Sequence, residues 1–228
     1  MAKISLRKPV KKTDRELFIA IEKMITQQDY VFLNHAKTRI KDRSILDTEV
    51  LDILEDKKGM HRKRNKRKDK YAFGLEEGRM MKLKTRKKYI YEGLGFPIQL
   101  CDVAMVNIQG DWHPKIDIRK IATEAIKKLA LQEERLTGNQ VKFIRSFFSM
   151  TLREFAETVV RESHTAVNKW EKYGNEVTNM DINIEKILRL YIYQKVCIKV
   201  SRHAFYDRLL EPSAISSGKK VSHLQMHV

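Results

Sequence analysis

The chain has little of what most catalytic or metal sites require. Among its 228 residues are only two cysteines, Cys101 and Cys197, whose separation indicates reduced thiols in a cytoplasmic protein. No Cys/His cluster has zinc spacing, and no glycine-rich phosphate loop or nucleophile elbow occurs, so we expect neither metal nor cofactor. A run of about eighteen apolar residues is also absent, and no apolar segment follows the basic N-terminus. We therefore expect no membrane span and no secretory signal.

Positive charge is what the chain has in excess. Its 46 Lys and Arg residues outnumber 29 Asp and Glu, which gives a formal net charge of +17. The excess is spread over the chain, with net +8 through Met80 and +9 after it. Such a balance favours a polyanionic partner held by salt-dependent phosphate contacts, although a merely soluble basic protein has the same composition.

The first part of the chain is predicted to be mainly helical. Apolar spacing predicts a helix over Thr13–Gln28, and Tyr30–Leu33 has the composition of a short strand. Asn34 is expected to cap a second helix and Asp47 a third. In the third helix four apolar residues are expected to face inward: Val50, Leu51, Ile53 and Leu54.

A small sheet is predicted in the middle of the chain. Three short apolar segments punctuated by Gly and Pro, Tyr89–Tyr91, Ile98–Val103 and Val106–Ile108, favour a hairpin or an antiparallel sheet. Helical periodicity returns over Ile116–Leu131. We expect this α+β segment to bind a partner, and the whole chain to be mainly α with small β elements.

A strongly basic run separates these two regions. Lys57–Lys70 contains nine Lys and Arg residues and one acid, which fits a solvated loop, an edge of a connecting strand or an RNA-binding segment equally well. After it, Glu76–Met81 can be encoded by a purine-rich ribosome-binding sequence and a start codon. Our hypothesis is that two genes have fused and that the second once began at Met80 or Met81.

The most informative segment is Thr151–Glu171, which predicts two short helices joined by a turn. Thr151 and Ser163 are the expected N-caps. The first helix is expected to bury Leu152, Phe155, Ala156 and Val159, and the second Ala166, Val167, Trp170 and Tyr173. The opposite face of the second helix carries only hydrogen-bonding and cationic groups: His164, Thr165, Asn168, Lys169 and Lys172. Such a face is suited to binding in the major groove of DNA. The alternative is an ordinary amphipathic helical hairpin with a solvated polar face. Glu171 lies beyond the polar stripe and is expected to be structural.

Neighbouring helices complete a predicted repressor-type helix-turn-helix bundle. An apolar helix follows Thr137, and Asp181 is expected to cap another helix near Ile182. The latter has two apolar seams, and we expect the second, with Leu190, Ile192, Tyr193 and Val196, to be a dimer interface. The tail beyond Pro212 is expected to be disordered.

This region resembles the Xre-type helix-turn-helix of bacterial antitoxins, on the pattern S-x-x-x-V-x-x-W-E at Ser163, Val167, Trp170 and Glu171. The turn between the two helices, Val160–Glu162, has no glycine and is one residue longer than the common Xre-type turn. In this it is similar to the turn of MqsA-like antitoxins, whose zinc-binding half has no counterpart here. The resemblance covers about Leu136–Val196 and implies a repressor of its own promoter that binds operator DNA. It implies base contacts by Thr165 and Lys169, and phosphate contacts by Thr151 and Arg153. From the polar stripe we also expect base contacts by His164 and Asn168, and phosphate contacts by Ser163 and Lys172.

The segment Tyr30–Lys70 is similar to small RNase-type toxins with an H-A-x-x-R-x-x-x-R pattern before Glu-Val. The resemblance implies a catalytic set of His35, Arg39 and Arg43, in which a histidine acts on a ribose 2′-OH and arginines hold phosphate. A solvated basic helix face is the alternative, and the strands that complete such toxins are missing. An endoribonuclease restrained in cis is therefore the second functional hypothesis, and a non-specific nucleic-acid binder the third.

The resulting prediction is a bacterial, cytoplasmic toxin–antitoxin fusion in four parts. Residues 1–80 are toxin-like and truncated, 81–135 form a small α+β segment, 136–200 bind DNA, and 201–228 are a flexible extension. The expected partners are double-stranded operator DNA, a second copy of the chain, a cognate toxin, and RNA at Lys57–Lys70. We expect no membrane partner, and enzymatic activity only if the toxin-like part retains its site.

Overall fold

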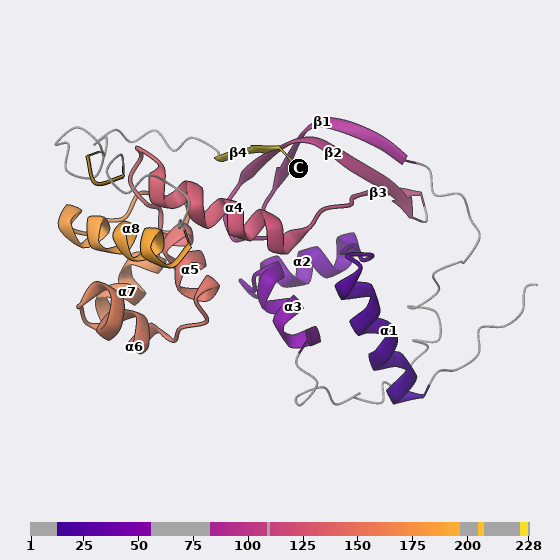
Figure 1. The fold of residues 1–228 in the computed structure, drawn as a ribbon, viewed down its shortest axis with the longest axis horizontal. Helices are drawn as coiled ribbons and strands as arrows, with labels where there is room; N and C mark the ends of the chain where they lie inside the picture. The colour runs from indigo at the N-terminus through magenta and orange to yellow at the C-terminus, as the bar shows by residue number, and fades with distance from the viewer. Residues whose placement is uncertain (1–12, 56–82, 109, 197–204, 208–223, 228) are drawn as a thin grey trace, which may run out of the picture.

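The computed structural model describes residues 13–55, 83–108, 110–196, 205–207 and 224–227. Within this part the chain has the predicted α+β character. Figure 1 shows the helices of residues 138–196 gathered at one end, the N-terminal helices of residues 14–55 toward the other, and a sheet above the long helix between them. The predicted basic segment Lys57–Lys70 and the methionines at 80 and 81 lie outside the described residues.

The sheet is built around one long strand. β2 (Ile98–Ile108) pairs antiparallel with β1 (Leu83–Tyr91) along one edge. Its other edge pairs antiparallel with β3 (Asp111–Pro114) and parallel with β4 (Leu224–His227). The predicted antiparallel sheet is confirmed, but two of the expected short strands are one continuous strand. The expectation of a disordered tail is wrong for Leu224–His227, because these residues pair with β2 and bury Met226.

A local change of backbone conformation lies in the middle of β2. Asp102 has a φ of 55°, in the left-handed region, where non-glycine residues are uncommon. Before it Ile98 and Leu100 are buried, and after it Val103 and Met105 are buried. The alternation of buried and exposed side chains along β2 therefore shifts by one residue at Asp102. The β1 residues that pair with these four buried residues lie on the same face of the sheet as they do.

The N-terminal helices are α1 (Asp14–Thr26), α2 (Asn34–Asp42) and α3 (Asp47–Glu55). Thr13 closes a capping box with Glu16 at the start of α1, as the sequence predicts. The strand expected at Tyr30–Leu33 does not form, because these residues find no strand partner and lead directly into α2.

Two expected caps are also wrong. Asn34 is the first residue of α2, and its side chain donates instead to the Asp111 carboxylate at 3.2 Å. Asp47 is the first residue of α3, and its carboxylate accepts a hydrogen bond from the Tyr91 hydroxyl at 2.8 Å. Of the four apolar residues expected inside α3, only Leu51 is buried, because one side of this short helix faces solvent.

The N-terminal helices and the sheet share one hydrophobic core. Leu46 and Leu51 belong to the same buried cluster as the β2 side chains. The backbone N–H of Asp47 donates to the Gly93 carbonyl at 2.8 Å, and a Cβ at Gly93 would lie 2.0 Å from the Asp47 carboxylate. Glycine is therefore required at position 93 for the close approach of Asp47. These contacts between residues 13–55 and the sheet cross the domain boundary that we predicted at residue 80.

The long central helix α4 (Ile118–Leu131) packs against α8 (Ile182–Val196). Glu185 and Arg189 of α8 are 0% and 1% exposed and form an ion pair of 2.7 Å. Arg189 also donates to the carbonyl of Glu134 at 2.6 Å, just beyond α4. These hydrogen bonds satisfy both buried charges and join the end of α4 to α8.

The two apolar seams predicted on α8 are divided differently in the structure. Ile192 and Tyr193, which we expected on a free dimer face, are buried within the chain. The side that remains accessible carries Ile187, which is 46% exposed, with half-buried Leu190 and Tyr191 beside it. The expected second seam is therefore wrong for Ile192 and Tyr193, which α8 packs against the chain's own core, whereas Leu190 and Val196 are half-buried.

Candidate nucleic-acid interface

The first helix of the informative segment begins at a well-formed cap. Thr151 accepts from the Glu154 N–H at 3.2 Å, and the Glu154 carboxylate accepts from the Thr151 N–H at 2.8 Å. α6 (Leu152–Phe155) continues as a π-helical turn, η2 (Ala156–Val160). Such widened turns are rare and frequently lie at functional sites.

The turn ends at an arginine in a conformation that usually requires glycine. Arg161 has φ 58° and ψ 43°, and the next N–H, of Glu162, donates to the Ala156 carbonyl at 3.0 Å. This explains how a turn without glycine closes the helix. Arg161 is exposed, and the sequence prediction did not include it among the DNA contacts.

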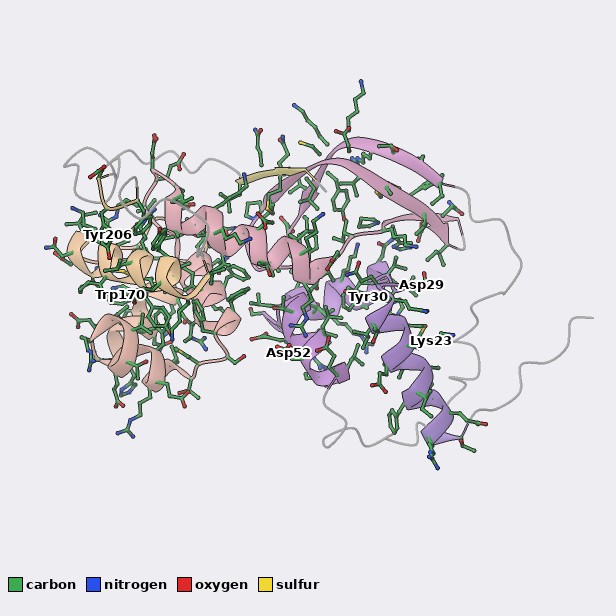
Figure 2. All side chains as sticks on the ribbon, viewed as in Figure 1. Lys23, Asp29, Tyr30, Asp52, Trp170 and Tyr206 are labelled. Carbon is green, nitrogen blue, oxygen red and sulfur yellow. The ribbon has the colours of Figure 1, made fainter. Side chains whose placement is uncertain are left out.

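The second helix, α7 (His164–Glu171), is fixed from behind. Ser163 caps it by accepting from the Ala166 N–H at 3.1 Å, as predicted. Val167 and Trp170 are 0% and 6% exposed, and Figure 2 labels Trp170 within the helical end of the molecule. At the start of α5 (Gly138–Phe147), a Cβ on Gly138 would lie 2.5 Å from the Trp170 carbonyl, so glycine permits α5 to approach α7 closely.

An ion pair holds the end of α7. Arg145 of α5 donates to both carboxylate oxygens of Glu171, at 2.6 and 2.9 Å, and the two side chains are 16% and 11% exposed. The hydrogen bond to Glu171 raises the pKa of Arg145. The prediction that Glu171 is structural is confirmed. Because Glu171 is the only carboxylate of α7, its inward position leaves the exposed face without negative charge.

All eight predicted DNA-contacting side chains are exposed: Thr151, Arg153, Ser163, His164, Thr165, Asn168, Lys169 and Lys172. Five of them lie on or directly after α7, and the Ser163 and Thr165 hydroxyls are 2.9 Å apart. Arg153 differs from the prediction in one respect, because it already pairs with Glu157 at 2.8 Å on the exposed side of the preceding helix.

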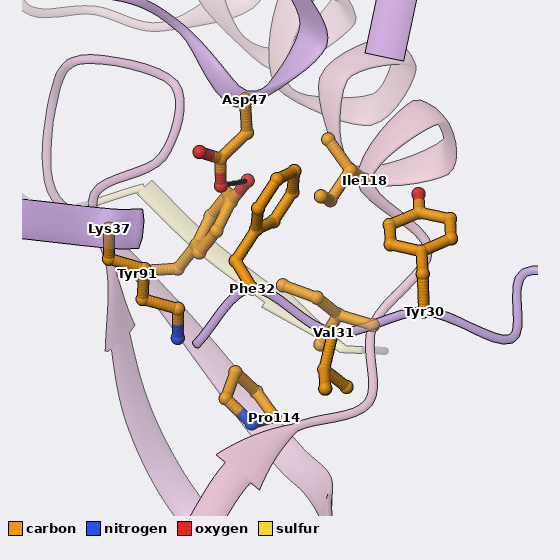
Figure 3. A pocket seen from close by; sticks show the side chains of 9 residues that line it. Tyr30, Val31, Phe32, Lys37, Asp47, Tyr91, Pro114 and Ile118 are labelled. Atoms are coloured by element: carbon orange, nitrogen blue, oxygen red, sulfur yellow. Dashed lines mark hydrogen bonds between the residues drawn. The ribbon is translucent and has the colours of Figure 1, made fainter. Parts of the chain in front are cut away.

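The three predicted catalytic side chains, His35, Arg39 and Arg43, are exposed on or directly after α2, a helix without a single buried residue. None of them lines the nearby pocket shown in Figure 3. Among the described residues, no side chain is placed to orient them by a hydrogen bond or an ion pair. The structure therefore gives these three residues none of the enclosure that general acid–base catalysis uses.

The pocket itself lies between the N-terminal helices and the sheet. It is lined by Lys37, Asp47, Tyr91 and aromatic side chains, and Figure 3 shows the Asp47–Tyr91 hydrogen bond at its wall. Burial raises the pKa of Asp47 and lowers the pKa of Lys37; burial also raises the pKa of Tyr30 to about 12. The empty space is about 260 Å³, part of it open solvent.

A buried histidine lies close to this pocket. His113 of β3 is 2% exposed, and its Nδ1 finds no partner among the described residues. Burial, with a smaller effect of the Lys37 charge, lowers the pKa of His113, so the neutral ring is favoured. Neutral His113 and the Asp47–Tyr91 pair are consistent with a packed contact between helices and sheet.

Within the described ranges, no helix is long and apolar enough to cross a membrane, and no group of three or more His, Cys, Asp or Glu side chains could hold a metal ion. No family model, curated protein or solved structure matches this chain.

Proposed function

We propose that this protein is a sequence-specific DNA-binding repressor of the antitoxin type, with α7 as its recognition helix. The observation that carries the proposal is the division of α7 into two faces. Val167, Trp170 and Glu171 fix one face to the core, while His164, Asn168 and Lys169 stand exposed on the other. A helix held in this way presents polar groups to base edges without the entropy loss of ordering a mobile segment.

The exposed residues divide into two roles by position and chemistry. His164, Thr165, Asn168 and Lys169 lie along α7 and are assigned to base edges, where Asn suits adenine and Lys suits guanine. Thr151, Ser163 and Lys172 lie at helix ends and are assigned to phosphates. Arg153 joins the phosphate set once it releases Glu157, and Arg161 in the turn is added to it because its charge is exposed and unpaired in the described structure.

A second copy of the chain is part of the proposal. Two recognition helices reach successive major grooves when they lie about 34 Å apart, which requires a dimer. The accessible side of α8, at Ile187, Leu190 and Tyr191, is assigned to that contact; of the seam expected from sequence it keeps Leu190 and leaves out the buried Ile192 and Tyr193. Ile187→Glu is then expected to shift the chain from dimer to monomer in sedimentation analysis while leaving its helical content unchanged.

The DNA-binding proposal is tested by selecting sequences from a random duplex pool with the full chain. Lys169→Ala is expected to weaken binding of the selected duplex by about 1–3 kcal/mol and to relax preference at one base pair. Lys128→Ala, at an exposed position of α4, removes the same charge away from α7 and is the matched control. An unchanged affinity and base preference for Lys169→Ala would refute the assignment.

A further inference from the structure

The strand β1 carries a concentration of charge that the proposed operator contact does not use. Lys84, Arg86, Lys87 and Lys88 are all exposed, and none has a carboxylate ion pair within the described part of the chain. Only Asp102 and Asp111 contribute carboxylates on the neighbouring strands β2 and β3. Among the described strands, β1 pairs on one edge alone, with β2.

Two of these cations lie over aromatic rings. The Lys84 ammonium lies 3.9 Å from the centre of the Trp112 ring, and the Arg86 guanidinium lies 5.7 Å from the centre of the Tyr89 ring. Both rings are half-buried, so each presents part of its surface to solvent. These contacts hold the two cations above the sheet by cation–π attraction.

The shift of alternation at Asp102 brings these residues together. Lys84, Arg86 and Tyr89 lie opposite Met105, Val103 and Leu100 of β2, which are the buried positions on either side of the shift. Residues that are paired across a ladder share a face, so Lys84, Arg86 and Tyr89 lie on the same side of the sheet. The Lys84 contact adds Trp112 of β3 to this side. We call Lys84, Arg86, Tyr89 and Trp112 the cation–aromatic face.

We propose that the cation–aromatic face binds single-stranded nucleic acid. Cations two residues apart on a strand are spaced by roughly 6.8 Å and can follow a phosphate backbone. When these side chains move from the rings to phosphates, the aromatic rings beneath them accept stacked bases. A duplex hides the flat surfaces of its bases, so only a single strand uses both components of this face. Exposed edge lysines can also serve to prevent strand aggregation, but that role does not account for two aromatic rings beneath the cations.

This proposal is independent of operator binding, because α7 contributes nothing to the face. The test uses the full chain and fluorescent oligouridine and oligothymidine of about 12 nucleotides, a length within the usual range for such surfaces. Lys84→Ala/Arg86→Ala is expected to weaken binding at least about five-fold and to reduce the salt slope by about 1.4, the value for two phosphates of a single strand. Lys120→Ala/Lys128→Ala on exposed positions of α4 removes equal charge and is expected to leave binding unchanged.

Substitution of Trp112 separates stacking from charge. Trp112→Phe keeps an aromatic ring and is expected to retain binding, whereas Trp112→Leu is expected to lose at least about five-fold. Equal binding of uridine and thymidine strands assigns the face to single strands in general, and preference for uridine assigns it to RNA; both support the proposal. It is overturned if oligonucleotides do not bind, if both double variants lose affinity equally, if Trp112→Leu binds as tightly as Trp112→Phe, or if a duplex competes as well as a single strand.

Discussion

Helices α2 and α7 have nearly the same length and carry similar polar stripes, yet they are attached to the molecule very differently. α2 places His35 and Arg39 one turn apart, with Arg43 one turn further on, and α7 places Thr165 and Lys169 in the same relation. However, α2 has no side-chain cap and no buried residue, whereas α7 has the Ser163 cap and buries Val167 and Trp170.

The difference shows that a polar stripe indicates a binding function only when the opposite face of its helix is fixed to the core. A stripe on a helix fixed by a cap, an aromatic anchor and an ion pair presents its groups in a defined geometry. A stripe on a peripheral helix is explained equally well as a solvated surface. We therefore assign recognition to α7, and we interpret His35, Arg39 and Arg43 as a solvated basic face of α2.

The largest expected contrast concerns the apolar anchors of the two helices. Trp170→Ala removes a side chain that is 6% exposed and is expected to destabilise the protein by about 4 kcal/mol. Ile40→Ala on α2 removes a half-buried side chain, with an expected loss of about 1 kcal/mol. Urea unfolding of the full chain measures both; similar losses would remove the distinction between the two helices.

The second contrast concerns the ion pairs. Glu171→Ala leaves Arg145 largely buried without its bidentate partner and is expected to lower the free energy of unfolding by about 2 kcal/mol. Glu92→Ala breaks the exposed Lys41–Glu92 pair at the end of α2 and is expected to leave the unfolding midpoint unchanged. If Glu171→Ala is as harmless as Glu92→Ala, α7 does not depend on this pair.

The third prediction separates stability from binding in the turn before α7. Arg161→Gly relieves a left-handed backbone conformation and is expected to stabilise the protein by up to about 1 kcal/mol. The same change removes an exposed cation and is expected to weaken duplex binding. In this one variant the thermal unfolding midpoint should therefore rise while the affinity for duplex DNA falls. A fall in both quantities would mean that contacts of the Arg161 side chain hold the turn.

The smallest predicted effect is a pH dependence at the contact between α3 and the sheet. Burial raises the folded-state pKa of Asp47 above 3.8, so the contribution of this carboxyl to stability is present at lower pH and is lost as pH rises through its folded pKa. Asp47→Asn removes this titration. The variant is expected to gain stability relative to the parent as the pH rises from acid toward neutral, and a difference that is constant with pH would contradict a buried titrating carboxyl.

The region of α7 was largely predictable because its signals are local. The caps Thr151 and Ser163 and the buried Val167 and Trp170 follow from spacing within one or two helical turns. Tyr173, expected on the same buried face, is wrong: it lies beyond the end of α7 and is 38% exposed. Even the inward position of Glu171 followed from its place beside the polar stripe, although its partner Arg145, 26 residues earlier, did not.

The sheet region was less predictable because its features depend on distant residues. β4 pairs with β2 although more than a hundred residues separate them, and four residues near the end of a polar tail give little signal of a strand. The contact of Asp47 with Tyr91 spans 44 residues, so Asp47 resembled an ordinary cap in sequence. The cation–aromatic face depends on the left-handed residue Asp102, which no alternation pattern reveals in advance.

The central claim is that α7, and not α2, recognises DNA, and one titration tests it most directly. Affinity for the selected duplex is measured with Asn168→Ala/Lys169→Ala and with Arg39→Ala/Arg43→Ala in the full chain. The α2 variant loses more positive charge, yet the α7 variant is expected to lose more affinity, by about 1–3 kcal/mol for each base contact. A loss from the α2 variant equal to or larger than that from the α7 variant would contradict the account.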